Sequence, residues 1–313
     1  MNRRQDVQEL GWHSSDDGAR KRLLAGIPVT ERRLEPAGIT TAVLEGGDGP
    51  PMVLMHGGIE TGGVYWAPVI SRLAESYRLV IPDVPGMGES EPVARLDAEV
   101  FAEWFTALLR LTCEEKPMLI SHSLNGGLNA RFATHNSDLL RGLVLYGAPA
   151  IGHYRMPLGL LVAAIRFDLR PSERNNAHFA DWAFLDPART REQDPEWYDA
   201  FMAYGLSRGA EPHVKQTMRQ LVKAGSKQIS DADLRGIGVP VALIWGKRDR
   251  MVPLRIADRP APSSGGRCMS WTMPATSLIS SGPRRSFVRC EPPLPNLSHD
   301  REVHLSSRES PRD

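Results

Sequence analysis

Residues 118–127 read M-L-I-S-H-S-L-N-G-G, and this stretch decides the fold. Its first residues form a short apolar run typical of a buried strand, and the small residues around Ser123 favour a sharp turn into a helix. A strand, turn and helix of this kind lifts a serine hydroxyl above the end of a sheet. We therefore interpret Ser123 as a candidate nucleophile; the alternative is a serine in a buried turn without chemistry.

The residues two before and two after Ser123 depart from the usual pattern for such a turn, G-x-S-x-G. Ser121 and Asn125 stand where glycine is expected, and Gly126 and Gly127 follow at once. Asparagine is the larger departure, although it tolerates unusual backbone angles better than most residues.

Strand and helix patterns alternate on both sides of this stretch, which predicts an α/β fold with a mostly parallel sheet flanked by helices. Pro36 and Gly38 favour a hairpin between the first two strands. The predicted strands are 29–34, 39–44, 51–55, 78–81, 118–122, 143–146 and 239–245, and helical spacing marks 64–77 and 98–111.

Composition divides the chain into five segments. Residues 1–25 are polar and are expected to be a loosely attached arm, while 26–149 and 233–259 form the two parts of the core. Between them, 150–232 carries helical patterns at 158–167 and 214–222 and no convincing strand, which predicts a helical lid. The tail, 260–313, has eleven Ser and eight Pro, few recurring apolar positions and no convincing helix or strand, so an irregular or disordered segment is expected.

The net charge of +1 favours a small-molecule substrate over nucleic acid or a membrane as partner. Three scattered cysteines give neither a disulfide framework nor a zinc site, and no apolar run is long enough to span a bilayer. We expect a cytoplasmic protein without metal or cofactor, and the sequence leaves its oligomeric state open.

Four motifs in order resemble those of the α/β-hydrolase superfamily, specifically the small lidded serine hydrolases of bacteria. They are H-G-G at 56–58, D-V-P-G-M-G-E-S at 83–90, S-H-S-L-N-G-G at 121–127 and W-G-K-R-D-R-M-V-P at 245–253, and the resemblance covers about residues 28–258. It implies that Ser123 is the nucleophile and that the backbone N–H groups of Leu124 and Gly58 form the oxyanion hole. It also implies that Asp249 is the acid that orients the catalytic histidine; the alternative for Asp249 is a surface residue in a charged turn.

The other polar and aromatic residues of these motifs and of the predicted lid have structural interpretations. His56 and His122 are expected to shape their loops, and Asp83 and Ser90 to fix a turn. The lid aromatics are as consistent with a core as with a pocket; they are Trp182, Trp197, Tyr198 and Tyr204.

The catalytic histidine is the missing part. In this fold it follows the acid, yet only His299 and His304 follow Asp249, and both lie in the polar tail without the G-H context of the family. Shifting the reading frame after about residue 259 can spell H-V-L-D-D-A-G-H-V-P-H-L-E-R-P-E-A-F-V-R-A-L-R between Cys268 and Glu291, which supplies a strand, a histidine and a closing helix. We hypothesise that the tail is frameshifted, which would leave a sheet edge unpaired; sequencing the encoding DNA tests this.

The sequence thus favours a serine hydrolase of a small ester, thioester or related carbonyl compound, acting through an acyl-enzyme and impaired by the loss of its base. Two alternatives stay open: hydrolysis of a carbon–carbon bond by the same fold, and a non-catalytic homologue that keeps the pocket as a binding site.

Overall fold

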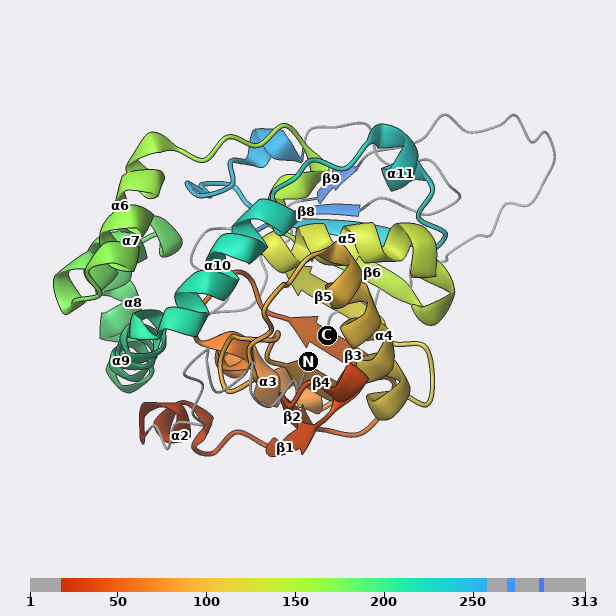
Figure 1. Ribbon diagram of the computed structural model, residues 1–313, viewed down its shortest axis with the longest axis horizontal. Helices are drawn as coiled ribbons and strands as arrows, with labels where there is room; N and C mark the ends of the chain where they lie inside the picture. The colour runs from red at the N-terminus through yellow and green to blue at the C-terminus, as the bar shows by residue number, and fades with distance from the viewer. Residues whose placement is uncertain (1–17, 258–268, 274–286, 290–313) are drawn as a thin grey trace, which may run out of the picture.

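A nine-stranded sheet in the order β1-β2-β4-β3-β5-β6-β7-β8-β9 forms the centre of the computed structural model, which describes residues 18–257, 269–273 and 287–289 (Figure 1). The strands from β4 to β8 in this order are parallel, while β1 and β2 pair antiparallel at one edge and β9 pairs antiparallel at the other. Their bounds are β1 (Thr30–Leu34), β2 (Thr41–Gly46), β3 (Pro51–Met55), β4 (Arg78–Pro82), β5 (Met118–His122), β6 (Gly142–Tyr146), β7 (Val241–Gly246), β8 (Met269–Met273) and β9 (Phe287–Arg289). The predicted mostly parallel α/β architecture and the antiparallel first pair are confirmed.

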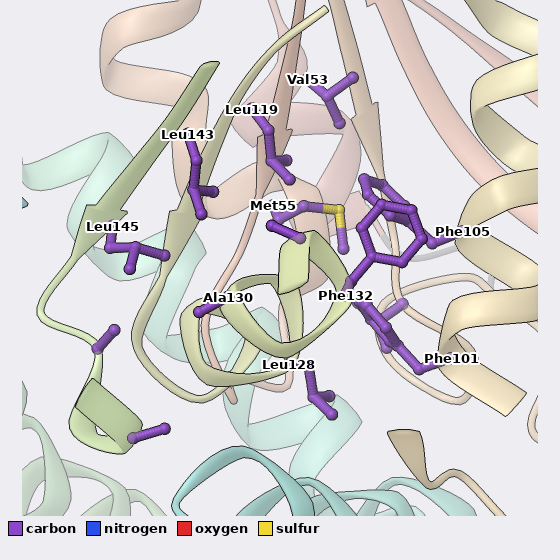
Figure 2. Packing of buried hydrophobic residues seen from close by; sticks show 14 of the residues in the cluster. Val53, Met55, Phe101, Phe105, Leu119, Leu128, Ala130, Phe132, Leu143 and Leu145 are labelled. Carbon is purple, nitrogen blue, oxygen red and sulfur yellow. The ribbon is translucent and has the colours of Figure 1, made fainter. Parts of the chain in front are cut away.

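Apolar clusters cover both faces of the central sheet. Successive residues of a strand point to opposite faces, so one strand contributes to both clusters. On β3, Val53 and Met55 belong to one apolar cluster, while Met52 and Leu54 belong to the other. Figure 2 shows the first cluster, where side chains of the central strands meet phenylalanines from two helices, α4 (Ala98–Thr112) and α5 (Ser123–Asn136). The Asp97 side chain begins α4 by accepting hydrogen bonds from the N–H groups of Glu99 and Val100.

The other face is covered by helices from distant parts of the sequence. Its cluster combines side chains of α2 (Gly18–Leu24), α3 (Ala67–Ala74) and α9 (Pro195–Ala210). Between β6 and β7 the chain is helical, as predicted, and α6 to α9 gather at one end of the molecule, at the left of Figure 1. The remaining helices are α6 (Leu158–Leu169), α7 (Glu173–Ala183), α8 (Pro187–Gln193), α10 (Pro212–Gly225) and α11 (Asp231–Arg235).

The expectation of a loosely attached N-terminal arm is wrong for residues 18–24. They form α2, whose Ala19, Arg20 and Leu23 are buried. The buried Arg20 guanidinium forms ion pairs with Asp83 at 3.2 Å and with Glu31 at 2.7 Å. The polar composition of residues 18–24 gave no sign that α2 packs on the sheet, because Arg20 is buried through ion pairs.

Within the Ser- and Pro-rich tail the structure has two short strands that the sequence did not indicate. Residues 269–273 form β8 parallel to β7, and residues 287–289 form β9 antiparallel to β8. The edge of β7 that the frameshift hypothesis left unpaired is therefore paired. The altered reading frame itself stays a prediction, and the proposed position of its lost histidine, at 275–276, lies outside the described residues.

Candidate active site

The topology of the sheet brings four loops together. Strands β3, β5, β6 and β7 are consecutive parallel neighbours, so the loops after them emerge side by side. The loops carry Gly57 and Gly58 after β3, Ser123 after β5, Gly147 after β6 and Asp249 after β7. This is the end of a parallel sheet at which ligands bind in open α/β folds.

Ser123 lies in a strained backbone conformation at the junction of β5 and α5. Its φ is 51°, and among the described residues only Ala37 is another non-glycine residue with a positive φ. The sequence supplies the turn by placing small residues around the serine. Because the first N–H groups of a helix have no intrahelical partner, the N–H of Leu124 is free to bind a negatively charged oxygen.

The loop after β3 approaches this turn closely. A Cβ atom added to Gly57 would lie 3.1 Å from Ser123 Cβ and 2.7 Å from His122 Nδ1. A Cβ atom on Gly58 would collide with the Leu124 side chain. Glycine at both positions therefore lets the loop backbone reach the serine, which is what a second oxyanion donor requires.

The two departures from the glycine pattern are hydrogen-bonded and buried. Asn125 donates through Nδ2 to the carbonyl oxygens of His56 at 2.7 Å and Gly57 at 3.3 Å. Ser121 Oγ accepts a 2.8 Å bond from Asn129 Nδ2 on α5. The asparagine thus ties the serine turn to the loop after β3, a link that glycine could not make.

Asp249 is held in a rigid turn after β7. Its Oδ1 accepts hydrogen bonds from the N–H groups of Met251 at 2.9 Å and Val252 at 2.8 Å, and Trp245 Nε1 fixes the loop through the Val252 carbonyl at 2.7 Å. Partial burial raises the pKa of Asp249, although the two N–H donors oppose the rise. Among described residues no hydrogen bond or ion pair engages its Oδ2, which lies beside the backbone of Gly147.

The His122 ring is stacked between Tyr65, at a ring distance of 4.9 Å, and Tyr146, at 4.6 Å. Burial lowers the pKa of His122 to about 3, and the nearby His56 adds to the decrease. A base with so low a pKa binds a proton poorly at neutral pH. His122 therefore shapes the floor of the site, and this agrees with the structural interpretation of its motif.

Ser123 lines two cavities. The larger, about 240 Å³, also has Asp249, Tyr146 and Arg248 in its wall, and aromatic residues of the segment between β6 and β7 line it as well. The smaller, about 130 Å³, is mostly apolar and has Glu60 among its lining residues. Burial raises the pKa of Glu60 to about 7. A substrate carbonyl at Ser123 could therefore place one substituent in each cavity.

The structure brings the four predicted site residues to one place; they are Ser123, Leu124, Gly58 and Asp249. His299 and His304 lie outside the described residues. Of the lid aromatics, Trp182 and Trp197 line the larger cavity, whereas Tyr204 is fully buried in the core.

His56, Asp83 and Ser90, which are expected to shape loops and turns, form hydrogen bonds within those loops. His56 Nε2 accepts the Val84 N–H at 3.0 Å, and Ser90 Oγ donates to the Asp83 carbonyl at 2.7 Å. Sequence reasoning missed Tyr65, Tyr146 and Glu60; the position of Tyr146 at the carboxyl end of a parallel strand was the available signal.

Among the described residues, no group of three or more His, Cys, Asp or Glu side chains is arranged to hold a metal ion. None of the described helices has both the length and the apolar character needed to cross a bilayer.

Comparisons with known proteins show what the chain is similar to. The chain is 26% identical over 238 residues to 2-hydroxy-6-oxo-6-(2'-aminophenyl)hexa-2,4-dienoic acid hydrolase of Metapseudomonas resinovorans, covering 72% of this chain and 77% of that protein. It is 27% identical over 230 residues to pimeloyl-[acyl-carrier protein] methyl ester esterase of Vibrio atlanticus, covering 67% and 81%. Among solved structures, naproxen esterase of Bacillus subtilis aligns with a TM-score of 0.68 at 18% identity, covering 86% of this chain and 95% of that one, and therefore supports the fold alone.

The family model described as alpha/beta hydrolase fold matches residues 50–263, which include β3 to β7, the helices between them and every predicted site residue. The chain belongs to the α/β-hydrolase fold family.

Proposed function

We propose that this chain is a serine hydrolase that acts on a small ester, thioester or related carbonyl compound through an acyl-enzyme. The observation that carries the proposal is Ser123 itself, a strained serine at a helix N-terminus that faces two cavities and lies against a glycine loop. The names of the relatives support the reaction class, since they are hydrolases and an esterase.

In the proposed reaction, Ser123 Oγ attacks the carbonyl carbon and its proton passes to a base. The negative charge that develops on the carbonyl oxygen is stabilised by the N–H groups of Leu124 and Gly58, and each such donor lowers the barrier by about 3 kcal/mol. The leaving group departs with a proton, and water then attacks the acyl-enzyme to release the acid and restore the serine.

The base is the weak part of this mechanism. Among the described residues, His122 is the histidine beside Ser123, and its lowered pKa suits it poorly for the role. Asp249 lines the same cavity as Ser123, which supports a role for its Oδ2 in orienting an imidazole. Because triad members act as a unit, loss of the base should reduce turnover by about 10⁴–10⁶, and the oxyanion donors would leave a slow residual activity.

Added imidazole tests this mechanism, because it can bind between Asp249 and Ser123 and serve as the base. We expect it to raise p-nitrophenyl butyrate hydrolysis by the chain above that of Ser123→Ala, measured at each imidazole concentration to subtract direct hydrolysis. Asp249→Asn should lose this gain, whereas Asp233→Asn, on exposed α11, should keep it. Equal rates for the parent chain and Ser123→Ala at every concentration would contradict the proposal.

A second candidate is hydrolysis of a carbon–carbon bond in a carboxylate-bearing dienoate. Arg248 and Arg250 line the larger cavity and could hold a carboxylate there, and relatives carry names of this chemistry. A folded chain that binds such an acid without cleaving it, even with imidazole, would favour the non-catalytic alternative.

A further inference from the structure

The outer face of α6 carries a stripe of exposed apolar side chains. Six large apolar side chains are exposed in the described part of the chain, and all but Leu111 lie on this helix. The five that form the α6 stripe are Leu158 (75% exposed), Leu161 (40%), Val162 (40%), Ile165 (47%) and Leu169 (75%). At 3.6 residues per turn they fall within an arc of roughly 100°, so they form one continuous surface.

The opposite face of α6 already provides the contacts that hold the helix to the protein. Leu160, Ala163 and Phe167 are buried on that side. Helices on a protein surface normally turn polar residues outward. The α6 stripe is therefore not explained by packing within the described chain, and an exposed apolar surface of this kind marks an interaction site.

Positively charged side chains lie on and next to the helix that carries the stripe. Four exposed arginines lie on or next to α6, namely Arg155, Arg166, Arg170 and Arg174. Between residues 153 and 175 the acidic side chains are Asp168, bonded to Arg219 of α10 at 2.6 Å, and Glu173. The nearly neutral charge of the whole chain concealed this local excess, because the acidic residues lie elsewhere.

We propose that the outer face of α6 docks on an anionic lipid surface. The stripe would enter the boundary between headgroups and acyl chains while the arginines contact lipid phosphates, as in helices that lie in a membrane interface. The positive charge argues against a second copy as occupant, because a two-fold interface would bring the same arginines together. This proposal departs from the composition-based expectation of no membrane partner.

Such docking would place the lipid next to the candidate active site. The inner face of α6 contributes Leu160, Ala164 and Phe167 to the smaller cavity, which also contains Ser123. An apolar ester dissolved in the lipid would then be one helix away from the serine. This consequence rests on the proposed function, but the docking itself does not.

The test is co-sedimentation of the full chain with vesicles of equimolar phosphatidylcholine and phosphatidylglycerol, compared with pure phosphatidylcholine. We expect binding to the anionic vesicles and weakening by salt. The triple variant Leu158→Ser, Ile165→Ser, Leu169→Ser should lose it. Leu111→Ser, which alters the exposed leucine of α4, is the matched control and should bind like the parent chain.

Charge reversal tests the second half of the surface. Arg166→Glu with Arg170→Glu should reduce the affinity for anionic vesicles by at least about 25-fold, from about fivefold per arginine. The proposal is overturned by absent binding to anionic vesicles, or by equal binding of the triple variant. A dimer in analytical ultracentrifugation that the triple variant abolishes, without vesicle binding, would overturn it by assigning the face to a second copy.

Discussion

Replacing Arg20 by alanine should lower the free energy of unfolding, because this arginine neutralises the buried carboxylate of Asp83. Arg20 forms ion pairs with Asp83 at 3.2 Å and Glu31 at 2.7 Å, and it donates to Tyr204 Oη at 3.2 Å. Tyr204 in turn donates to Glu89 at 2.9 Å. The network joins α2, the loop after β4 and α9, so it holds three distant segments together.

The expected loss follows from the fate of Asp83, which is fully buried. Removing one partner of a buried ion pair typically costs about 3–5 kcal/mol. Asp83 keeps hydrogen bonds from the N–H groups of Gly63 and Glu89, and the Glu31 side chain is 27% exposed and can be hydrated. Both effects place the expected loss near the lower limit, about 3 kcal/mol, which is a large part of the stability of an ordinary domain.

Urea denaturation followed by tryptophan fluorescence measures this loss. The control is Arg32→Ala, which removes an ion pair with Glu45 of similar length, 2.7 Å, but with the arginine side chain 55% exposed. Exposed pairs contribute about 0–1 kcal/mol. If Arg20→Ala lowers the free energy of unfolding by no more than Arg32→Ala does, the buried network does not stabilise the fold.

Three further changes test other parts of the account. Asn125→Ala removes the bonds to the carbonyl oxygens of His56 and Gly57 and should cost about 1–3 kcal/mol in urea denaturation; no loss would mean that the link is dispensable. Burial raises the pKa of Glu60 from 4.5 to about 7, so the folded chain binds more protons than the unfolded chain in that range, and unfolding free energy should fall between about pH 4.5 and about 7 and level off above. Glu60→Gln should lessen that fall, and an identical pH profile would contradict the assignment. Gly147 has a φ of 55°, so Gly147→Ala should cost about 1–2 kcal/mol by backbone strain; an unchanged thermal midpoint would exclude this strain.

Much of the fold could be predicted because its signals are local. Apolar runs located strands β1 to β7, helical spacing located α3, α4, α6 and α10, and the hairpin before β3 followed from Pro36 and Gly38. Helices α7, α8, α9 and α11 had no separate signal within the predicted helical lid. The docking of α2 could not be predicted, since it depends on a long-range ion pair between Arg20 and Asp83. Strand β8 was missed although Met269, Trp271 and Met273 alternate with Ser270 and Thr272, because the Ser- and Pro-rich composition around it indicated an irregular segment. Strand β9 has only three residues, too few for a pattern.

The site residues that could be predicted are those that lie in a recognisable motif directly after a predicted strand. Ser123, Gly58 and Asp249 have such signals. Glu60 has none, because its raised pKa depends on helices far away in sequence. The apolar spacing at 158–167 predicts a helix, but the sequence alone does not tell which of its apolar faces packs inward.

The most direct test of the central proposal, that Ser123 is a nucleophile with no effective base among the described residues, is covalent labelling by a fluorophosphonate probe. Intact-mass and peptide mass spectrometry of the full chain would follow labelling with and without imidazole. We expect slow labelling of Ser123. Imidazole should accelerate it, and Ser123→Ala should abolish it. A folded chain in which Ser123 stays unlabelled under both conditions, or in which labelling persists in Ser123→Ala, would contradict it.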